Sequence, residues 1–234
     1  AEGNVEFRIM PWPRLWTHVR LSAEMMRSAP DVLFVPAHVL PLVHPPRSVV
    51  TIHDLGYHYF PKAHPWASLL YLRFSTRMNA RLATLVIADS QATRADLMRI
   101  YGTPAQKIRV VYPGRDERLH RVEDKARILA VVRRLGIDGP YILYIGTLQP
   151  RKNLVRLIEA YHRVLARWPK TETAPLLVLA GRRGWLSDEI FRTVARLGLK
   201  HHVRFPGYIA DVDLPALLSG ASVFVFPSLY EGFG

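Results

Sequence analysis

Short runs of consecutive apolar residues recur along this chain, and most are followed by a turn residue and then by a helical stretch. A strand that is apolar at successive positions is buried on both faces, as in a parallel sheet covered by helices. We therefore predict two α/β domains, each with a mostly parallel sheet. The predicted strands are 31–35, 48–52, 84–88 and 108–112 in the first half, and 141–145, 176–179, 203–205 and 223–226 in the second.

Helices are predicted between these strands from apolar residues at helical spacing and from capping residues. Residues 66–82 form one such stretch, with Leu70, Phe74, Met78 and Leu82 near helical spacing. Ser90 precedes a helix at 92–100, Asn153 precedes the most strongly periodic helix in the chain, and Ser187 precedes a third; each is an expected N-cap.

The two halves are separated by a charged, polar run from Arg115 to Arg127 that has no strand pattern. We therefore expect an N-terminal domain over residues 1–115 and a C-terminal domain over 139–234. Residues 116–138 are expected to hold the linker and the start of the second domain.

Composition limits the classes of protein that this chain can belong to. Its 234 residues are 49% hydrophobic and 22% charged, which is typical of a globular protein, and no run approaches the length of a membrane span. The chain has no cysteine and no signal-peptide pattern at its start, so a cytoplasmic location is expected. The net charge of +13 predicts a negatively charged partner: nucleic acid, anionic lipid or a phosphorylated ligand.

The residues that could carry chemistry follow the carboxyl ends of predicted strands. His53 and Asp54 follow the second strand, Asp89 and Ser90 the third, and Gly146, Gly181 and the loop of Glu231 follow strands of the second half. Ligands bind at this edge of an open parallel sheet. Two domains with such edges facing one another would form a cleft.

The stretch from Gly146 to Asn153 favours a phosphate site. It places Arg151 and Lys152 beside the free N–H groups at the start of a helix, which suits a diphosphate. The alternative is two exposed basic residues in an ordinary loop. The loop from Ser228 to Gly234 combines Glu231 with two glycines, and its alternative is a tight turn with a solvated carboxylate.

Several of these stretches resemble motifs of the retaining family 4 glycosyltransferases, which have the GT-B fold. Pro227-Ser-Leu-Tyr-Glu-Gly-Phe-Gly234 is similar to the start of the Glu-x7-Glu motif of this family, and Gly146-Thr-Leu-Gln-Pro-Arg-Lys-Asn153 is similar to its diphosphate loop. Thr51-Ile-His-Asp-Leu55 has a weaker likeness to the histidine segment of the N-terminal domain. The resemblance implies two Rossmann-like domains, both incomplete here. The glycine-rich first loop of the N-terminal domain is missing, and so is the second half of the C-terminal domain, whose second Glu would follow Gly234 by five residues.

The resemblance also implies roles for individual residues. Lys152 would contact the donor diphosphate, and Glu231 and His53 would hold the donor sugar. Thr147 stands where many members have arginine, so Arg151 is expected to supply that charge. The other implied donor contacts are Gly146, Gly181, Arg182, Tyr208, Ser228, Gly232, Phe233 and Gly234.

The implied reaction is transfer of a hexose, with mannose expected, from a nucleotide sugar to a glycan or lipid-linked acceptor, with retention of anomeric configuration. GDP-mannose is the expected donor and a UDP-sugar the alternative, with no cofactor and no metal. Two other functions stay open: a non-catalytic nucleotide-sugar binder, and an epimerase or phosphorylase of the same fold. Nucleic acid is not expected as a partner, since no recognition motif is present.

Membrane contact is the remaining expectation. Arg73, Arg77 and Arg81 recur every four residues on the predicted helix at 66–82. A solvated helix face explains this stripe, and so does a contact with lipid phosphates, which would place the protein peripherally on the inner face of a membrane.

Overall fold

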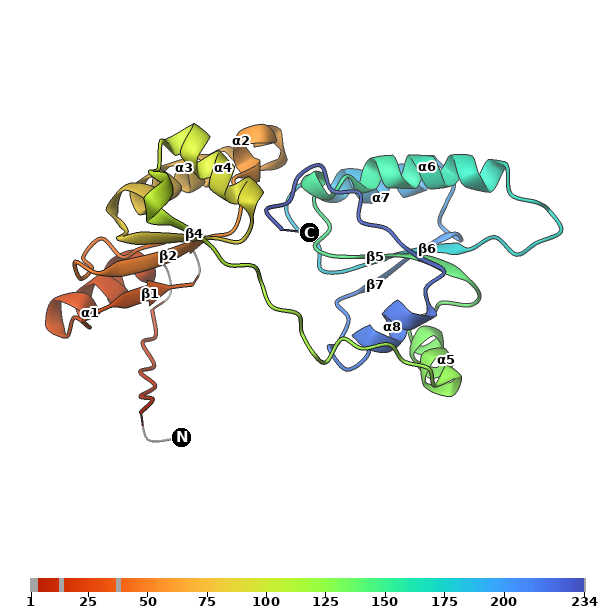
Figure 1. The fold of residues 1–234 in the computed structure, drawn as a ribbon. Helices are drawn as coiled ribbons and strands as arrows, with labels where there is room; N and C mark the ends of the chain where they lie inside the picture. Colours follow the sequence, from red (N-terminus) through yellow and green to blue (C-terminus); the bar gives the residue numbers. More distant parts are fainter. Residues whose placement is uncertain (1–3, 13–14, 37–38, 234) are drawn as a thin grey trace. The chain divides into compact units, whose positions relative to one another are not determined.

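The computed structural model describes residues 4–12, 15–36, 39–233 of the chain. The chain divides into two compact units (Figure 1). Unit 1 consists of residues 1–59, 66–113 and 232–234, and unit 2 of residues 60–65 and 114–231. Each unit contains one four-stranded sheet in which all the paired strands run parallel, so the predicted α/β class is confirmed.

Unit 1 is built around a sheet with the strand order β1-β2-β3-β4. Helices α3 and α4 make the crossovers from β2 to β3 and from β3 to β4, as parallel strands require. Val50, Val86 and Ile108 from three neighbouring strands meet in its core with Leu97 of α4. The elements are η1 (Thr17–Leu21), α1 (Ser22–Arg27), β1 (Leu33–Val35), β2 (Ser48–Ile52), α2 (Gly56–Tyr59), α3 (Trp66–Leu82), β3 (Leu85–Ala88), α4 (Gln91–Tyr101), η3 (Ala105–Lys107) and β4 (Ile108–Val110).

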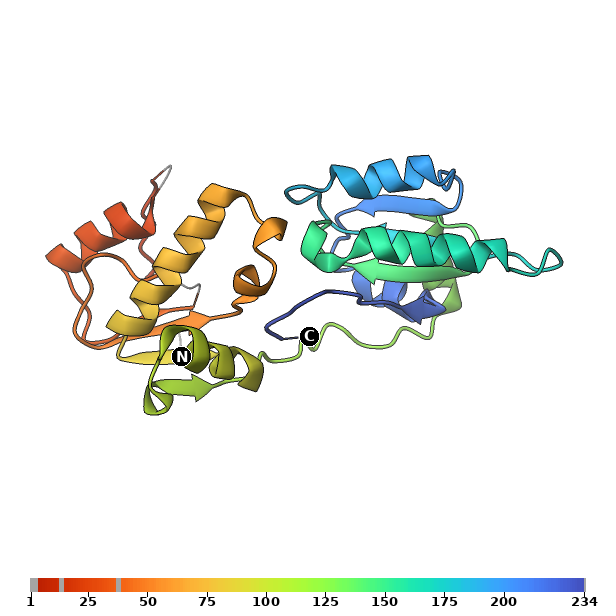
Figure 2. The same ribbon diagram turned by 90° about the horizontal axis from the view of Figure 1, so that it is seen from above.

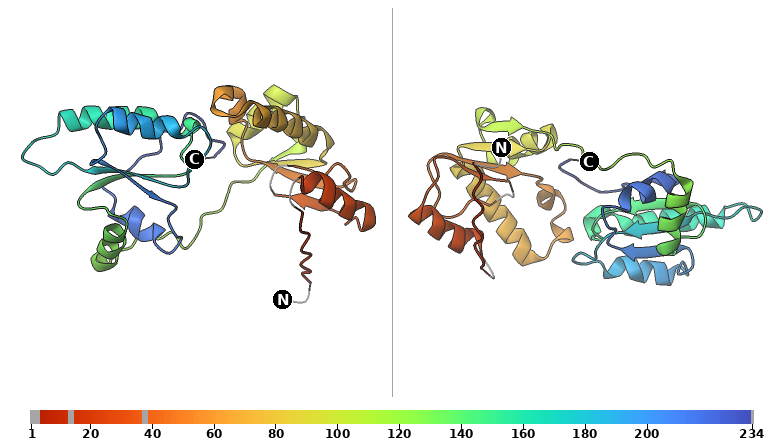
Figure 3. Two further views of the ribbon diagram at one scale, coloured as in Figure 1. Left: turned by 180° about the vertical axis from the view of Figure 1, so that it is seen from behind. Right: turned by 90° about the horizontal axis from the view of Figure 1, so that it is seen from below.

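Unit 2 has the strand order β7-β6-β5-β8. Helices α6 and α7 lie over one face of its sheet, and α5 and α8 cover the other (Figures 1 and 3). The elements are η2 (Pro61–Ala63), α5 (Lys125–Arg134), β5 (Tyr141–Ile145), η4 (Pro150–Lys152), α6 (Leu154–Ala166), β6 (Leu176–Ala180), α7 (Asp188–Arg196), β7 (Val203–Gly207), α8 (Leu214–Gly220) and β8 (Val223–Phe224).

The two-sided cover explains why the strands of unit 2 are apolar at successive positions. In β6, Val178 packs into the core beneath α5 and α8, whereas Leu177 and Leu179 pack beneath α6 and α7. In β5, Leu143 likewise packs beneath α5 and α8, and Tyr144 packs beneath α6 and α7. Figure 2 shows α6 and α7 lying side by side over the sheet, which agrees with the packing of their apolar side chains in one cluster.

The last predicted strand is shorter and more exposed than expected. The run at 223–226 was expected to be buried on both faces, but β8 covers only Val223–Phe224, and both side chains are exposed. The reason is topological: β8 pairs with β5 and lies at the edge of the sheet, with no further strand on its outer side among the described residues.

The helix α3 has the predicted bounds, but its apolar face does not pack on the core. A periodic apolar face normally packs on the core. In α3 the buried residues are instead small or polar, namely Ser75, Thr76, Asn79 and Ala80. Leu70, Phe74 and Leu82 of the predicted apolar stripe are exposed.

Candidate functional site

The cations of the predicted phosphate loop in unit 2 are joined to the carboxylate of Glu231. The Lys152 Nζ lies 2.5 Å from one carboxylate oxygen, and Arg151 Nη1 lies 3.0 Å from the other. The same Arg151 nitrogen donates to the Tyr230 carbonyl at 2.6 Å. The three charged side chains are largely buried, with 13%, 12% and 17% of the Arg151, Lys152 and Glu231 side chains exposed. We call these three residues the charged cluster.

Backbone contacts hold together the two loops that carry the charged cluster. The Leu229 N–H donates to the Arg151 carbonyl at 2.9 Å, and Asn153 Nδ2 donates to the Pro227 carbonyl at 3.1 Å. Asn153 occupies the N-cap position of α6, as expected, but its side chain does not cap the helix. Its backbone is left-handed, with φ +59°, which turns the amide toward Pro227 and away from the helix N–H groups.

Electrostatics keep Glu231 ionised in this cluster. Burial alone would raise the pKa of the carboxyl, but the Lys152 and Ser228 side chains and the charge of Arg151 outweigh it, so the pKa is lowered. The Ser228 Oγ is itself buried and makes no hydrogen bond of ordinary geometry among the described residues, although it contributes to that lowered pKa. A buried hydroxyl of this kind has hydrogen-bonding capacity left for a ligand.

The ionised Glu231 predicts a pH-dependent contribution to stability. At neutral pH, Glu231→Gln is expected to lower the free energy of unfolding by about 1–2 kcal/mol, because it removes the charge that both cations face. A carboxyl with a lowered folded pKa stabilises the protein above its unfolded pKa of roughly 4.3 and loses that effect as pH falls through the folded value. The difference between wild type and variant should therefore shrink in acid.

Urea unfolding over a series of pH values measures this difference. Glu172→Gln is the control, since Glu172 is an exposed residue of the same unit. A Glu231→Gln variant as stable as the control at neutral pH would show that the charged cluster contributes nothing to folding.

A second group of predicted donor contacts lines a pocket at the carboxyl edge of the same sheet. The pocket has a volume of about 280 Å³ and is lined by Gly146, Thr147, Gly181, Arg182 and Tyr208, all predicted from the sequence, with Ile145, Ile209, Asp211 and Leu214. The Arg182 guanidinium lies over the Tyr208 ring, 4.7 Å from its centroid. We call this the edge pocket.

Two glycines allow the strand ends to approach one another at the edge pocket. Gly181 has φ +141°, and a Cβ at this position would collide with the Gly146 carbonyl. Gly146 has φ +154°, and a Cβ there would collide with the Tyr144 hydroxyl. The loops that follow are paired, since the Leu148 N–H donates to the Arg182 carbonyl and the Gly184 N–H to the Leu148 carbonyl, both at 2.9 Å.

His53 is placed in unit 1, at the carboxyl end of β2. Its Nδ1 lies 2.6 Å from an Asp89 carboxylate oxygen, and Asp89 directly follows β3. A carboxylate accepts a hydrogen bond from Nδ1–H, so this contact fixes the ring orientation and selects the tautomer. The neighbouring Asp54 accepts from the Gly56 N–H at 2.8 Å, which fits a turn role.

The sequence identified most of these residues singly, and the structure shows which of them lie together. The charged cluster and the edge pocket both belong to unit 2, while Gly232 and Phe233 group with unit 1. Gly234 lies outside the described residues. Asp211 of the edge pocket was missed, since its only sequence signal is its position shortly after β7. Within the described parts of the chain, no three His, Asp or Glu side chains gather into a metal site.

The fold consists of two α/β units, each with a parallel sheet. The candidate site places cations and glycines at the carboxyl edge of one of these sheets. Together these features are typical of a nucleotide-binding α/β protein. Two family models match adjoining parts of the chain, "Glycosyltransferase Family 4" over residues 4–119 and "Glycosyl transferases group 1" over residues 130–234. The chain belongs to glycosyltransferase family 4, also called group 1, and has the GT-B fold.

Several of the curated relatives are named as mannosyltransferases. O-antigen chain mannosyltransferase B of Escherichia coli is 34% identical over 190 residues, covering 80% of this chain and 49% of that protein. Mannosylfructose-phosphate synthase of Agrobacterium fabrum is 31% identical over 160 residues, covering 66% of this chain and 35% of that protein. The chain thus spans half or less of the length of these relatives.

Solved structures give the same fold. The Anabaena protein HepE, crystallised with UDP-glucose, is 26% identical with a TM-score of 0.61, covering 78% of this chain and 47% of that one. WaaG, a glycosyltransferase involved in lipopolysaccharide biosynthesis, is 18% identical with a TM-score of 0.66, covering 91% of this chain and 57% of that one. The second likeness concerns the fold alone.

Proposed function

We propose that unit 2 binds a nucleotide-sugar donor, and that the protein is a retaining hexosyltransferase that uses GDP-mannose. The observation that carries this proposal is the charged cluster, in which two largely buried cations lie beside a carboxylate at the carboxyl edge of the sheet. The mannosyltransferase relative supports mannose as the sugar, and HepE with UDP-glucose supports a nucleotide-sugar donor. The acceptor is proposed to be a glycan or a lipid-linked glycan.

Each part of the donor has a proposed set of contacts. The diphosphate would bind Lys152 and Arg151, where positive charge stabilises the departing diphosphate. The sugar hydroxyls would bind the Glu231 carboxylate and the Ser228 hydroxyl. His53, oriented by Asp89, is the sugar contact proposed for unit 1. The loop N–H groups of Gly232, Phe233 and Gly234 remain proposed donor contacts.

The edge pocket is the proposed site of the nucleobase. Tyr208 and Arg182 offer a stacked aromatic and cationic surface, and Gly146, Thr147 and Gly181 let the backbone approach. Asp211 adds a carboxylate, which accepts hydrogen bonds. Guanine presents an N1–H and an exocyclic amine as adjacent donors, whereas uracil presents a single N–H between two carbonyls. The carboxylate therefore favours guanine.

Asp211→Asn tests the base assignment. We expect GDP to bind about tenfold more weakly, since a hydrogen bond to a charged group contributes about 1.5–3 kcal/mol, while UDP binding changes less. Isothermal titration calorimetry with both nucleotides gives the two affinities. Asp138→Asn removes an exposed carboxylate elsewhere in unit 2 and is the control. Equal losses for GDP and UDP would contradict a base-reading role.

A thermal-shift panel with GDP, GDP-mannose, UDP and UDP-glucose, without added metal, tests the proposed function. A ligand at a hundredfold excess over its Kd stabilises the native state by about 2.7 kcal/mol, so binding raises the melting temperature. We expect GDP and GDP-mannose to give the larger shifts. No shift with any of the four would overturn the donor site. Release of the sugar to phosphate, or its epimerisation without an acceptor, would instead favour a phosphorylase or an epimerase.

A further inference from the structure

The outward face of α3 carries large apolar side chains that the fold does not use. The exposed fraction is 76% for Trp66 and 65% for Phe74, and Leu70 between them is also exposed. These residues are spaced by four along the helix, so they form one stripe on one side. An exposed apolar stripe on a helix indicates a binding surface.

The inward face of α3 packs on unit 1 without using the large apolar side chains. It packs through the small and polar residues Ser75, Thr76, Asn79 and Ala80. Asn79 Oδ1 accepts a hydrogen bond from the Leu40 N–H at 3.0 Å, which anchors the helix to a loop of unit 1. The helix is thus held by close backbone approach and a buried hydrogen bond, and its large apolar residues remain available for another surface.

A stripe of arginines runs beside the apolar one. Arg73 and Arg77 follow Leu70 and Phe74 by three positions, and Arg81 follows the partly buried Met78 by three, so the two stripes are neighbours on the helix surface. Within the described residues none of the three forms an ion pair with a carboxylate, and α3 itself contains no Asp or Glu. Their charges are therefore available for a negatively charged partner.

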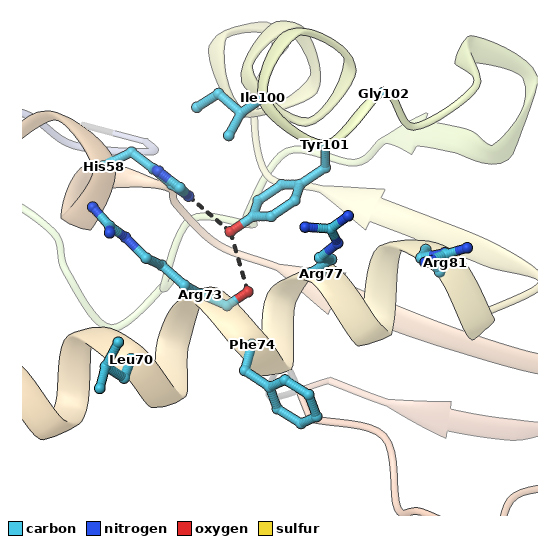
Figure 4. A pocket seen from close by; sticks show the side chains of 9 residues that line it. All are labelled: His58, Leu70, Arg73, Phe74, Arg77, Arg81, Ile100, Tyr101 and Gly102. Carbon is cyan, nitrogen blue, oxygen red and sulfur yellow. Dashed lines mark hydrogen bonds between the residues drawn. The ribbon is translucent and has the colours of Figure 1, made fainter.

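The arginines border a hollow of about 780 Å³ between α3 and the end of α4 (Figure 4). Tyr101 reaches from α4 toward α3, with its hydroxyl 2.7 Å from His58 Nε2 and 3.4 Å from the Arg73 carbonyl. Figure 4 shows Phe74 on the side of α3 that faces away from Tyr101. Leu70 and Phe74 also line this hollow, and with Trp66 they form an apolar ridge beside the guanidinium groups. Arginine binds phosphate oxygens through a pair of parallel hydrogen bonds.

We propose that α3 docks unit 1 onto an anionic lipid bilayer. Trp66, Leu70 and Phe74 enter the interfacial region, and Arg73, Arg77 and Arg81 bind lipid phosphates. A helix of 17 residues is about 25 Å long and can lie flat in the interface. Among the described residues no helix is long and apolar enough to span a bilayer. The net charge of +13 favours an anionic surface.

A bilayer fits this surface better than a nucleic acid or a protein partner does. Nucleic acid would use the arginines but would leave the apolar ridge in water, and an apolar protein partner would leave the arginines unmatched. A lipid bilayer offers phosphates and hydrocarbon at adjacent depths, which matches the adjacent stripes. Tryptophan and arginine side chains, with polar tips on apolar bodies, suit this boundary.

Flotation with phosphatidylcholine vesicles, with and without phosphatidylglycerol, tests the proposal on the full chain. We expect binding to the anionic vesicles only, with a loss as salt rises. Each arginine near an anionic surface contributes about fivefold in affinity. The triple change Arg73→Glu, Arg77→Glu and Arg81→Glu should therefore lower vesicle binding by roughly a hundredfold or more.

A matched control changes three exposed arginines of unit 2 by the same total charge: Arg133→Glu, Arg163→Glu and Arg167→Glu. It should bind vesicles more tightly than the α3 triple variant. Equal losses in the two variants would show that net charge alone drives binding and would overturn the docking role of α3.

The pair of changes Leu70→Ser and Phe74→Ser tests the apolar ridge separately. Both side chains are exposed, so the melting temperature should stay near that of the wild type while vesicle binding falls. Wild-type binding to single-stranded RNA with no binding to anionic vesicles would also overturn the proposal. The shift with GDP should be the same in the α3 variants, so this test is independent of the donor site.

Discussion

Replacing Lys152 by alanine is expected to weaken the binding of GDP by roughly tenfold to a hundredfold. The ammonium group is largely buried, and its only carboxylate partner among the described residues is Glu231, at 2.5 Å. A diphosphate bound at this loop would accept a charge-assisted hydrogen bond from Lys152, which contributes about 1.5–3 kcal/mol. Isothermal titration calorimetry at fixed ionic strength measures the loss.

Lys200→Ala is the matched control for Lys152→Ala. Lys200→Ala removes an exposed lysine of the same unit, with the same change in net charge. GDP affinity should be unchanged in this control at physiological salt. If Lys152→Ala and Lys200→Ala both bind GDP like the wild type, then the charged cluster is a structural ion network and the diphosphate binds elsewhere. The melting temperature of each variant shows that the protein tested is folded.

The ion pairs of the charged cluster also bear on how a donor would enter. The Glu231 carboxylate neutralises part of the charge of Arg151 and Lys152. An arriving diphosphate would compete for these cations, and in the proposed function the carboxylate would turn to the sugar hydroxyls. Burying two cations without any partner is costly, so the Glu231 carboxylate stabilises the two loops that carry Arg151 and Lys152.

The fold was predictable because its signals are local. Successive apolar residues at 141–145 and 176–179 need cover on both faces, and parallel sheets with helices provide it. The strands β2 and β5 have the predicted bounds, and α3 does too. Ser90 caps α4 as expected, with its Oγ accepting from the Thr93 N–H at 3.1 Å. The residue types at the strand ends also located His53 and Lys152 at the carboxyl edges of the two sheets.

What was not predictable depends on contacts between distant segments. The sequence of α3 gives its helical period but not which stripe faces the core, because Asn79 is buried through a bond to Leu40, 39 residues away. The exposure of β8 follows from its place at the edge of the sheet, which the strand order decides. The left-handed Asn153 depends on Pro227, 74 residues further along the chain. None of these partners can be read from a local pattern.

Gly181→Ala is expected to be the most destabilising single change at the edge pocket, with a loss of about 2–4 kcal/mol in the free energy of unfolding. The backbone of Gly181 has φ +141°, which other residues rarely adopt, and its added methyl would collide with the Gly146 carbonyl. The chain cannot shift easily to relieve this, since the Gly181 N–H donates to the Gly207 carbonyl at 2.7 Å and the Gly146 N–H to the Ala180 carbonyl at 3.0 Å.

Gly198→Ala measures the cost of the left-handed backbone without the steric collision expected in Gly181→Ala. Gly198 also has a left-handed backbone, with φ +69°, but a Cβ there would meet no atom within 4 Å. This variant should lose only about 1 kcal/mol, the cost of the left-handed conformation for alanine. Urea unfolding followed by far-ultraviolet circular dichroism gives both values, with the slope checking that the same surface is exposed. If the two variants lose equal stability, Gly181 does not pack against Gly146. A larger loss for Gly181→Ala means that the edge pocket depends on backbone atoms too close to admit any side chain.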